Sequence, residues 1–327
     1  MIMTLCLVII VALVFEYING FHDSANAIAT VVSTKVLTPR TAIIYGAIFN
    51  FIGAFSGTHV AKTIGAGIID ATGITQTVIL CALMGAIVWN LVTWYYGLPS
   101  SSSHALIGGL LGASASYSGI GHINGSGVFH KVIIPMLVSP VLGVFVGFFV
   151  MLVLLKLFFR AHPDKSNRYF RKLQLLSAGL MAFSHGSNDA QKTMGIITLA
   201  LVSHQFIDNF EVPFWVIFVC ALTMGLGTMA GGWRIIHTMG TKVVKLRPIH
   251  GFAVEITASF IILIASFFGI PISTTHIKTT AVMGVGATIR LSALKWSLIG
   301  SIIWAWVLTI PICAALAALF YYIQSLF

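Results

Sequence analysis

The stretch Gly20-Phe21-His22-Asp23-Ser24-Ala25-Asn26-Ala27 places an acid, an imidazole and an amide between long apolar segments. A second stretch, Gly186-Ser187-Asn188-Asp189-Ala190-Gln191-Lys192, repeats the G-x-x-D pattern in similar surroundings. A charged side chain inside a membrane span costs at least ~2.5 kcal/mol on insertion scales, so such residues are taken as functional by default. Two related copies strengthen the hypothesis that both motifs belong to a functional site.

The composition identifies an all-α polytopic membrane protein. The 327-residue chain is 58% hydrophobic and 8% charged, whereas about 25% of the residues in a soluble domain are charged. Long uninterrupted apolar runs exclude a β-barrel, whose strands alternate polar and apolar residues, and helices are then the remaining spanning elements. The positive net charge of +10 comes from basic residues scattered over short loops, so no nucleic-acid partner is predicted. Four cysteines lie singly in apolar runs, a spacing that predicts no metal site.

Three landmarks recur in the same order in both halves of the chain. The acidic motifs come first, GTHVAKTIGAGII (57–69) and GWRIIHTMGTKVV (232–244) follow, and LPSSSSH (98–104) and IPISTTH (270–276) come last. These correspondences predict an internal duplication, which in transporters places the substrate site where the copies meet. We expect a first repeat at 1–159, a basic linker at 160–172 and a second repeat at 173–327.

The hydropathy pattern predicts about ten transmembrane helices plus two re-entrant helical hairpins. The expected long spans include Met1–Ile18, Thr41–Ala61, Ile74–Tyr96, Val132–Phe159, Pro213–Gly231, Gly251–Phe268 and Leu294–Tyr322. The polar stretches after Gly97 and Gly269 favour hairpins at about 97–121 and 269–289, because two short half-helices that enter and return are cheaper than a polar crossing. Five spans per half would invert the second repeat relative to the first. The loop charges leave the orientation of the termini open.

Each hairpin offers several hydroxyl groups at the start of a helix. The predicted anion-binding residues are Ser101, Ser102, Ser103, Ser273, Thr274 and Thr275. The unpaired N–H groups of a first helical turn and its partial positive charge favour an oxyanion. The alternative is that these side chains bond to their own helix or help helices pack. Their occurrence in two matching positions favours a site for a tetrahedral anion.

The intramembrane acids are the predicted ion-coupling residues. Asp23 and Asp189 could each take up a proton, because burial disfavours the charged form, or ligate a cation. The alternative is a structural hydrogen bond at a helix break. Glu255, in GFAVEITASF, is a third candidate for coupling or gating. Glu16 lies near the end of the first span, and we expect it at the membrane interface.

Histidines and lysines near the motifs are predicted to support the site. His22, His104, His185 and His276 could carry protons, because imidazole titrates near neutral pH, although each more often orients a neighbour. Lys192 and Lys278 could offset a nearby carboxylate or the anion itself.

Taken together, these motifs resemble the inorganic phosphate transporter (PiT) family over essentially the whole chain. The resemblance rests on GFHDSANAIAT (20–30), HGSNDAQKTMG (185–195) and the paired hairpin motifs. It implies a symporter of inorganic phosphate in the bacterial cytoplasmic membrane that works by alternating access of two inverted repeats. It also implies that the hairpin hydroxyls hold the anion, while the Asp/Asn motifs, including Asn26 and Asn188, handle the coupling ion.

Two departures from the family pattern concern the coupling ion. Sodium-coupled members carry Asn before the Asp and three residues after it in both motifs, whereas here His22 and Lys192 replace one Asn each. An ammonium group beside Asp189 would repel sodium, so we predict proton coupling, with sodium as the alternative. The low-affinity bacterial branch that the sequence resembles most implies transport of phosphate as a complex with a divalent cation. A homodimer is left open.

Two other functions are alternatives to phosphate transport. A sulfate permease of the same family remains an alternative, because both anions are tetrahedral and hydroxyl donors do not distinguish them. An intramembrane enzyme, suggested by Ser184 and His185 beside Asp189, is disfavoured because the chain has no GxSxG elbow and no HExxH helix. We therefore predict no enzymatic activity and no cofactor.

Overall fold

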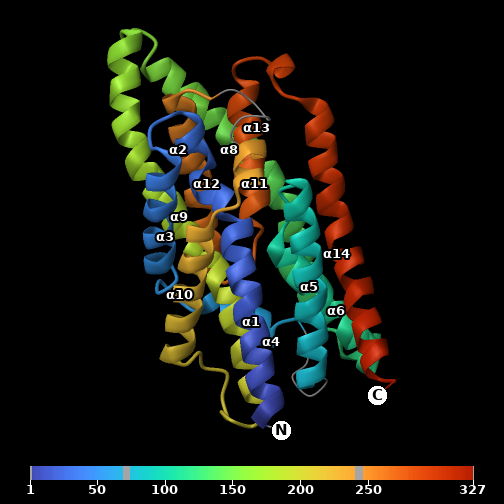
Figure 1. Cartoon of the computed structure of the whole chain (residues 1–327). Coiled ribbons are helices and arrows are strands. Elements are labelled where there is room, and N and C mark those ends of the chain that lie inside the picture. The colour runs from blue at the N-terminus through green and yellow to red at the C-terminus, as the bar shows by residue number, and fades with distance from the viewer. Residues whose placement is uncertain (1, 69–73, 240–245, 327) are drawn as a thin grey trace.

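Helices make up the regular structure of the chain. The structure, a computed structural model, describes residues 2–68, 74–239 and 246–326, and no strand occurs within these ranges (Figure 1). The helices are α1 (Ile2–His22), α2 (Ser24–Ser33), α3 (Pro39–Gly53), α4 (His59–Ala66), α5 (Gln76–Tyr96), α6 (Ser102–Ser118), α7 (Gly125–Val128), α8 (Ile134–Leu157), α9 (Pro163–Ser203), α10 (Phe214–Ala230), α11 (Trp233–His237), α12 (Pro248–Phe267), α13 (Thr274–Ala287) and α14 (Trp296–Gln324). Ile69 and residues 240–244 of the middle landmark lie outside the described residues.

Several of these helices have the length and composition of membrane spans. Five described segments qualify: Ile2–Ser33, Gln76–Tyr96, Gly125–Leu157, Pro248–Phe267 and Trp296–Gln324. Helix α10 is apolar but shorter. The predicted class, an all-α polytopic membrane protein, is therefore supported, while the number of about ten spans and the inversion of the second half stay predictions.

The single span expected at Thr41–Ala61 is wrong, because the chain forms two helices there. Helix α3 ends at Gly53, where the Ser56 hydroxyl donates to the Gly53 carbonyl at 2.7 Å and is also hydrogen-bonded to the Ser187 hydroxyl at 2.6 Å. Helix α4 begins only at His59. The hydroxyl of Ser56 thus pairs with a carbonyl at the C-terminal end of α3 and links this end to α9.

The two acidic motifs have different backbones. Asp23 lies at a break between α1 and α2, with φ −94° and ψ 4°. Asp189 lies inside α9, which continues without a break from Pro163 to Ser203 over 41 residues. The second acidic motif therefore lies within a continuous helix, and most of the predicted linker at 160–172 forms the first turns of α9. The basic residues of the linker are followed directly by apolar sequence that is compatible with a helix, and no proline interrupts this sequence.

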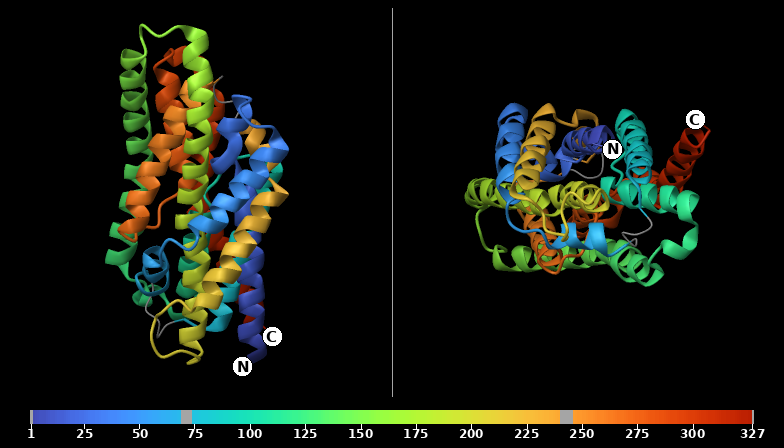
Figure 2. Two further views of the ribbon diagram at one scale, coloured as in Figure 1. Left: turned by 90° about the vertical axis from the view of Figure 1, so that its left-hand side faces the viewer. Right: turned by 90° about the horizontal axis from the view of Figure 1, so that it is seen from below.

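Helix α9 packs against more than half of the other helices in the described chain. These include α1, α2, α3, α4, α10 and α12. Seen from below (Figure 2, right), α9 lies between a row with α3, α10 and α1 on one side and α12 and α8 on the other. The largest apolar core joins side chains of α1, α4, α5, α6, α9 and α10.

The two hairpin regions each contain one long helix and not the two short half-helices expected. Gly97 and Gly269 both have φ 66° and end α5 and the α12 region, because this left-handed conformation favours glycine. An extended segment follows each glycine and leads into α6 or α13. Helix α6 then packs on α5 and α14, whereas α13 packs on α12 and α8. Each hairpin helix therefore packs on the last long helix of the opposite half.

Close approach of α9 and α3 requires Gly186. A Cβ atom at this position would lie 2.1 Å from the carbonyl oxygen of Asn50, and such overpacking costs about 1–3 kcal/mol. We therefore expect Gly186→Ala to lower the thermal unfolding midpoint of the purified protein in detergent. Gly300→Ala is the matched control, because nothing lies within 4 Å of its added methyl group. Equal midpoints for the two variants would contradict this close packing.

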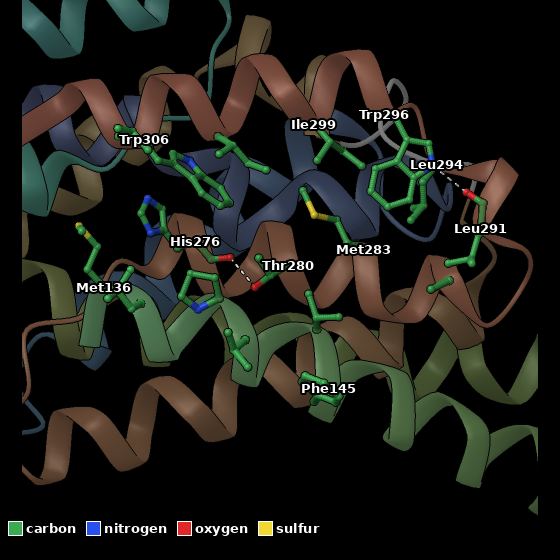
Figure 3. Close-up of a pocket in the computed structure, with 17 residues that line it drawn as sticks. Met136, Phe145, His276, Thr280, Met283, Leu291, Leu294, Trp296, Ile299 and Trp306 are labelled. Carbon is green, nitrogen blue, oxygen red and sulfur yellow. Dashed lines mark hydrogen bonds between the residues drawn. The ribbon is translucent and has the colours of Figure 1, made fainter. Parts of the chain in front are cut away.

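A wide apolar groove on the outside of the bundle is separate from the acidic motifs. It has a volume of about 560 Å³ and lies between α8, α13 and α14. Figure 3 shows Met136 and Phe145 of α8 on one side, Trp306 of α14 on the other, and Thr280 on α13 between them. The Thr280 hydroxyl is bonded to the His276 carbonyl at 2.7 Å. Apart from His276, whose ring nitrogens have no hydrogen-bond partner, the rest of the lining is almost wholly apolar, so the groove does not suit an anion and the candidate site lies elsewhere.

Candidate functional site

The N-terminal ends of α6 and α13 meet inside the bundle. The hydroxyl of Ser101 accepts a hydrogen bond from the His104 N–H at 3.2 Å and so caps α6. Ser273 caps α13 in the same way, by accepting from the His276 N–H at 3.2 Å. The rings of His104 and His276 contact each other, with centroids 4.8 Å apart. Two helix ends with partial positive charge therefore lie side by side.

Asp23 lies next to the start of α13. Its Oδ1 atom is 2.8 Å from His22 Nδ1 and accepts a hydrogen bond from the Thr275 hydroxyl at 3.2 Å. Asn26 donates from Nδ2 to the same hydroxyl oxygen at 2.8 Å. All four side chains are buried. The first acidic motif is thus bonded to the hairpin helix of the second half of the chain.

Asp189 lies next to both hairpin helices. Its Oδ2 atom accepts a hydrogen bond from the Thr274 hydroxyl at 2.9 Å and is 3.1 Å from His185 Nε2. The Lys192 ammonium, one turn further along α9, donates to Asp189 Oδ1 and to the Ser103 hydroxyl. Lys192 therefore joins the second acidic motif to the start of α6 while neutralising Asp189.

The two acids belong to one cluster. Asp23, His185 and Asp189 are all buried, and each offers a ligand atom within 4.8 Å of the others. Three such atoms could hold a cation. Because Lys192 already supplies a positive charge at Asp189, a metal ion would have to compete with its ammonium group.

The predicted anion-binding hydroxyls all lie at this junction but have different partners. Five have protein partners in the structure: Ser101, Ser103, Ser273, Thr274 and Thr275. The hydroxyl of Ser102 is buried and has no hydrogen-bond partner. An unpaired buried hydroxyl is costly, so Ser102 has a donor available for a ligand.

Glu255 and Lys278 form a second buried cluster. The Thr30 hydroxyl donates to Glu255 Oε1 and the Ser177 hydroxyl donates to Oε2, each at 2.5 Å. Lys278 Nζ donates to the Thr30 hydroxyl at 3.1 Å. Thr30 lies on α2, two turns after Asp23. The third acid is therefore connected to the first acidic motif through α2 and not to the hairpin hydroxyls.

Asn188 does not take the position that Asn26 takes in the first motif. Its Nδ2 donates to the Ser266 hydroxyl of α12 at 2.9 Å, and its Oδ1 has no hydrogen-bond partner. The two asparagines that were predicted to act alike therefore have different surroundings, with Asn188 bonded to neither Asp23 nor the hairpin threonines.

Sequence reasoning did not predict the burial of Glu16 and gave too little weight to His185. Glu16 is fully buried within the protein, whereas the sequence predicted only a position near the end of the first span, and it accepts a hydrogen bond from the Thr193 hydroxyl through Oε2. His185 contacts Asp189 and also lies 3.1 Å from Asn50 Oδ1 through its Nδ1. The spacing of the two acids could have indicated the position of Glu16. Glu16, on α1, precedes Asp23 by about two helical turns, so the two residues are expected on the same face.

Known proteins resemble this chain over nearly its whole length. The sequence model of the phosphate transporter family matches residues 19–317. The "Probable low-affinity inorganic phosphate transporter" of Rhizobium meliloti (strain 1021) is 49% identical over 320 residues, covering 97% of this chain and 96% of that protein. The protein of the same name from Bacillus subtilis (strain 168) is 46% identical over 323 residues, covering 98% of this chain and 97% of that protein.

A solved structure has a similar fold. The structure of a protein named "The sodium-dependent phosphate transporter" superposes with a TM-score of 0.87, covers 99% of both chains and is 25% identical. The relatives are named as transporters, and none of these names describes an enzyme.

Proposed function

This chain belongs to the phosphate transporter family, and we propose that it is a proton-coupled symporter of inorganic phosphate in the bacterial cytoplasmic membrane. Its bacterial relatives are named as low-affinity inorganic phosphate transporters, and the sequence prediction of a transporter agrees with those names. Phosphate is the proposed substrate in preference to sulfate because the matching family and these relatives are described by phosphate.

The observation that carries this proposal is the meeting of two helix starts beside two acids. Helices α6 and α13 supply first-turn N–H groups and hydroxyls, which suit an oxyanion, and Lys192 adds a cation between them. Thr274 and Thr275 contact Asp189 and Asp23. An anion bound by these hydroxyls would therefore take their hydrogen bonds away from the acids, and this exchange couples anion binding to the charge state of the acids.

Proton coupling is favoured by the position of Lys192. Its ammonium group occupies Asp189 Oδ1, one of the oxygens that a sodium ion would need. The competing proposal is sodium coupling, supported by the grouping of Asp23, His185 and Asp189 and by the name of the structural relative. The same group could also hold a divalent cation that accompanies phosphate.

Alternating access fits the way in which the two halves interlock. Helices α6 and α13 each pack on the last long helix of the opposite half, so movement of one half would displace the hairpin helix of the other. We therefore propose that the repeats at 1–159 and 173–327 are inverted and open the site to each side in turn.

Uptake of radiolabelled phosphate into proteoliposomes tests this function. We expect an imposed inward proton gradient to drive accumulation, an imposed sodium gradient to have no effect and excess sulfate to compete poorly. Uptake that requires sodium would overturn the coupling proposal. Strong competition by sulfate would move the substrate to the alternative anion, and a comparison with and without Mg²⁺ would test transport as a metal complex.

A further inference from the structure

Three of the four buried acids in the described chain have cationic or titratable partners. Asp23 is beside His22, and Asp189 contacts His185 and Lys192. Glu255 receives hydrogen bonds from Thr30, Gln174 and Ser177, and the Lys278 ammonium is bonded to Thr30 and interacts with Glu255 electrostatically. Such partners stabilise an ionised carboxylate.

Glu16 is the exception among these acids. The Thr193 hydroxyl donates to its Oε2, Oε1 makes no hydrogen bond, and the Asn19 side chain lies close by. Its exposed fraction is 0%. A buried carboxylate with a single neutral hydrogen-bond donor and no directly bonded cation is strongly disfavoured, and such a group takes up a proton instead of remaining charged.

The titratable groups around Glu16 are few and lie on two helices. Asp189 and Lys192 of α9 and Cys220 of α10 interact with it electrostatically. Of the other helices that pack on α1, α2 carries no titratable side chain, and Cys81 is the titratable residue on the buried face of α5. Lys192 is the one cation among these groups, and its ammonium is already bonded to Asp189 and Ser103.

We propose that Glu16 is the site that binds and releases the coupling proton, while Asp189 stays ionised as the partner of Lys192. This assignment rests on the proposed proton symport. A carboxylate oxygen of Glu16 accepts a proton from a hydronium ion, which becomes water, to form a neutral carboxylic acid, and it returns the proton to water as hydronium on the other side of the membrane.

Loss of the proton from Glu16 would affect the anion site through α9. Thr193, which is bonded to Glu16, follows Lys192 directly in the chain. An ionised Glu16 competes with Asp189 for the ammonium group, and movement of Lys192 withdraws its hydrogen bond from Ser103 at the start of α6. Protonation of Glu16 therefore holds Lys192 at the anion site, which links the proton to phosphate.

Infrared spectroscopy of the purified protein tests the proton directly. We expect a carboxylic acid C=O band at neutral pH that is lost in Glu16→Gln and kept in Glu211→Gln, which changes an exposed glutamate. Persistence of the whole band in Glu16→Gln would overturn the assignment, whether or not the variant transports phosphate.

Transport measurements separate this inference from the function on which it rests. In proteoliposomes we expect a proton gradient to stimulate phosphate uptake by the Glu211→Gln variant. We expect the Glu16→Gln variant to lose this stimulation, with the rate of phosphate exchange as the reference for each variant. Unchanged stimulation in Glu16→Gln would refute the role of Glu16 alone. A wild-type protein that does not respond to the proton gradient would refute proton symport and this assignment with it.

A milder variant guards against misfolding of Glu16→Gln. Thr193→Val removes the hydroxyl donor to Glu16 while keeping the shape of the side chain. Because a donor stabilises the carboxylate, its loss should shift the pH dependence of uptake toward more alkaline pH. An unchanged pH profile with normal folding would contradict the proposed proton site.

Discussion

Asp189→Asn is expected to abolish accumulation of phosphate against its gradient. The carboxylate of Asp189 receives hydrogen bonds from Lys192 and from Thr274, so it contacts both the cation and a predicted anion donor. The amide cannot balance the ammonium charge, and leaving a buried charge unpaired costs about 3–5 kcal/mol. We expect reduced stability as well as loss of uptake, measured by detergent melting and by radiolabelled phosphate in proteoliposomes.

The double variant Asp189→Asn with Lys192→Met separates folding from coupling. It removes both charges, and replacing a buried ion pair with neutral groups is often tolerated. We expect the double variant to regain the stability lost by the single one but not concentrative uptake. Recovery of normal accumulation would mean that coupled transport needs neither Asp189 nor Lys192.

The duplicated motifs allowed the sequence to predict which residues come together. Because LPSSSSH and IPISTTH recur after the two acidic motifs, a common site was expected, and the structure places Thr274 on Asp189 and Thr275 on Asp23. The sequence could not give the crossed pairing in which α13 contacts the first acid. That pairing depends on how α6 and α13 pack on α14 and α8, and hydropathy alone carries no information about helix neighbours.

The incorrect expectations share a physical cause. Apolar sequence indicates that a segment can be buried but not whether its helix continues, so the break after Gly53 and the unbroken α9 were both missed. The break after Gly53 involves a side chain that contacts a distant element, because the Ser56 hydroxyl bonds to Ser187 of α9. The burial of Glu16 was missed for a similar reason, because Glu16 is bonded to Thr193, which is 177 positions away in the chain.

Replacing Ser102 and Thr274 by Ala is expected to weaken phosphate binding more than either change alone. Ser102 has a buried hydroxyl without a partner, and Thr274 has a hydroxyl that can turn from Asp189 to the anion. A hydrogen bond to a charged group contributes about 1.5–3 kcal/mol, and each 1.4 kcal/mol is about tenfold in affinity. Each single variant should therefore bind phosphate roughly 10–100-fold more weakly in equilibrium binding measurements.

Matched controls on the same two helices distinguish anion binding from packing. Ser116 bonds to the Gly112 carbonyl of α6 and Thr280 to the His276 carbonyl of α13, so their hydroxyls serve their own helices. We expect Ser116→Ala with Thr280→Ala to leave phosphate affinity unchanged. If the pair at Ser102 and Thr274 also leaves affinity unchanged, the hairpin hydroxyls act in helix packing and the anion must be held by other donors. Equal weakening by both pairs would point instead to a general loss of packing at α6 and α13.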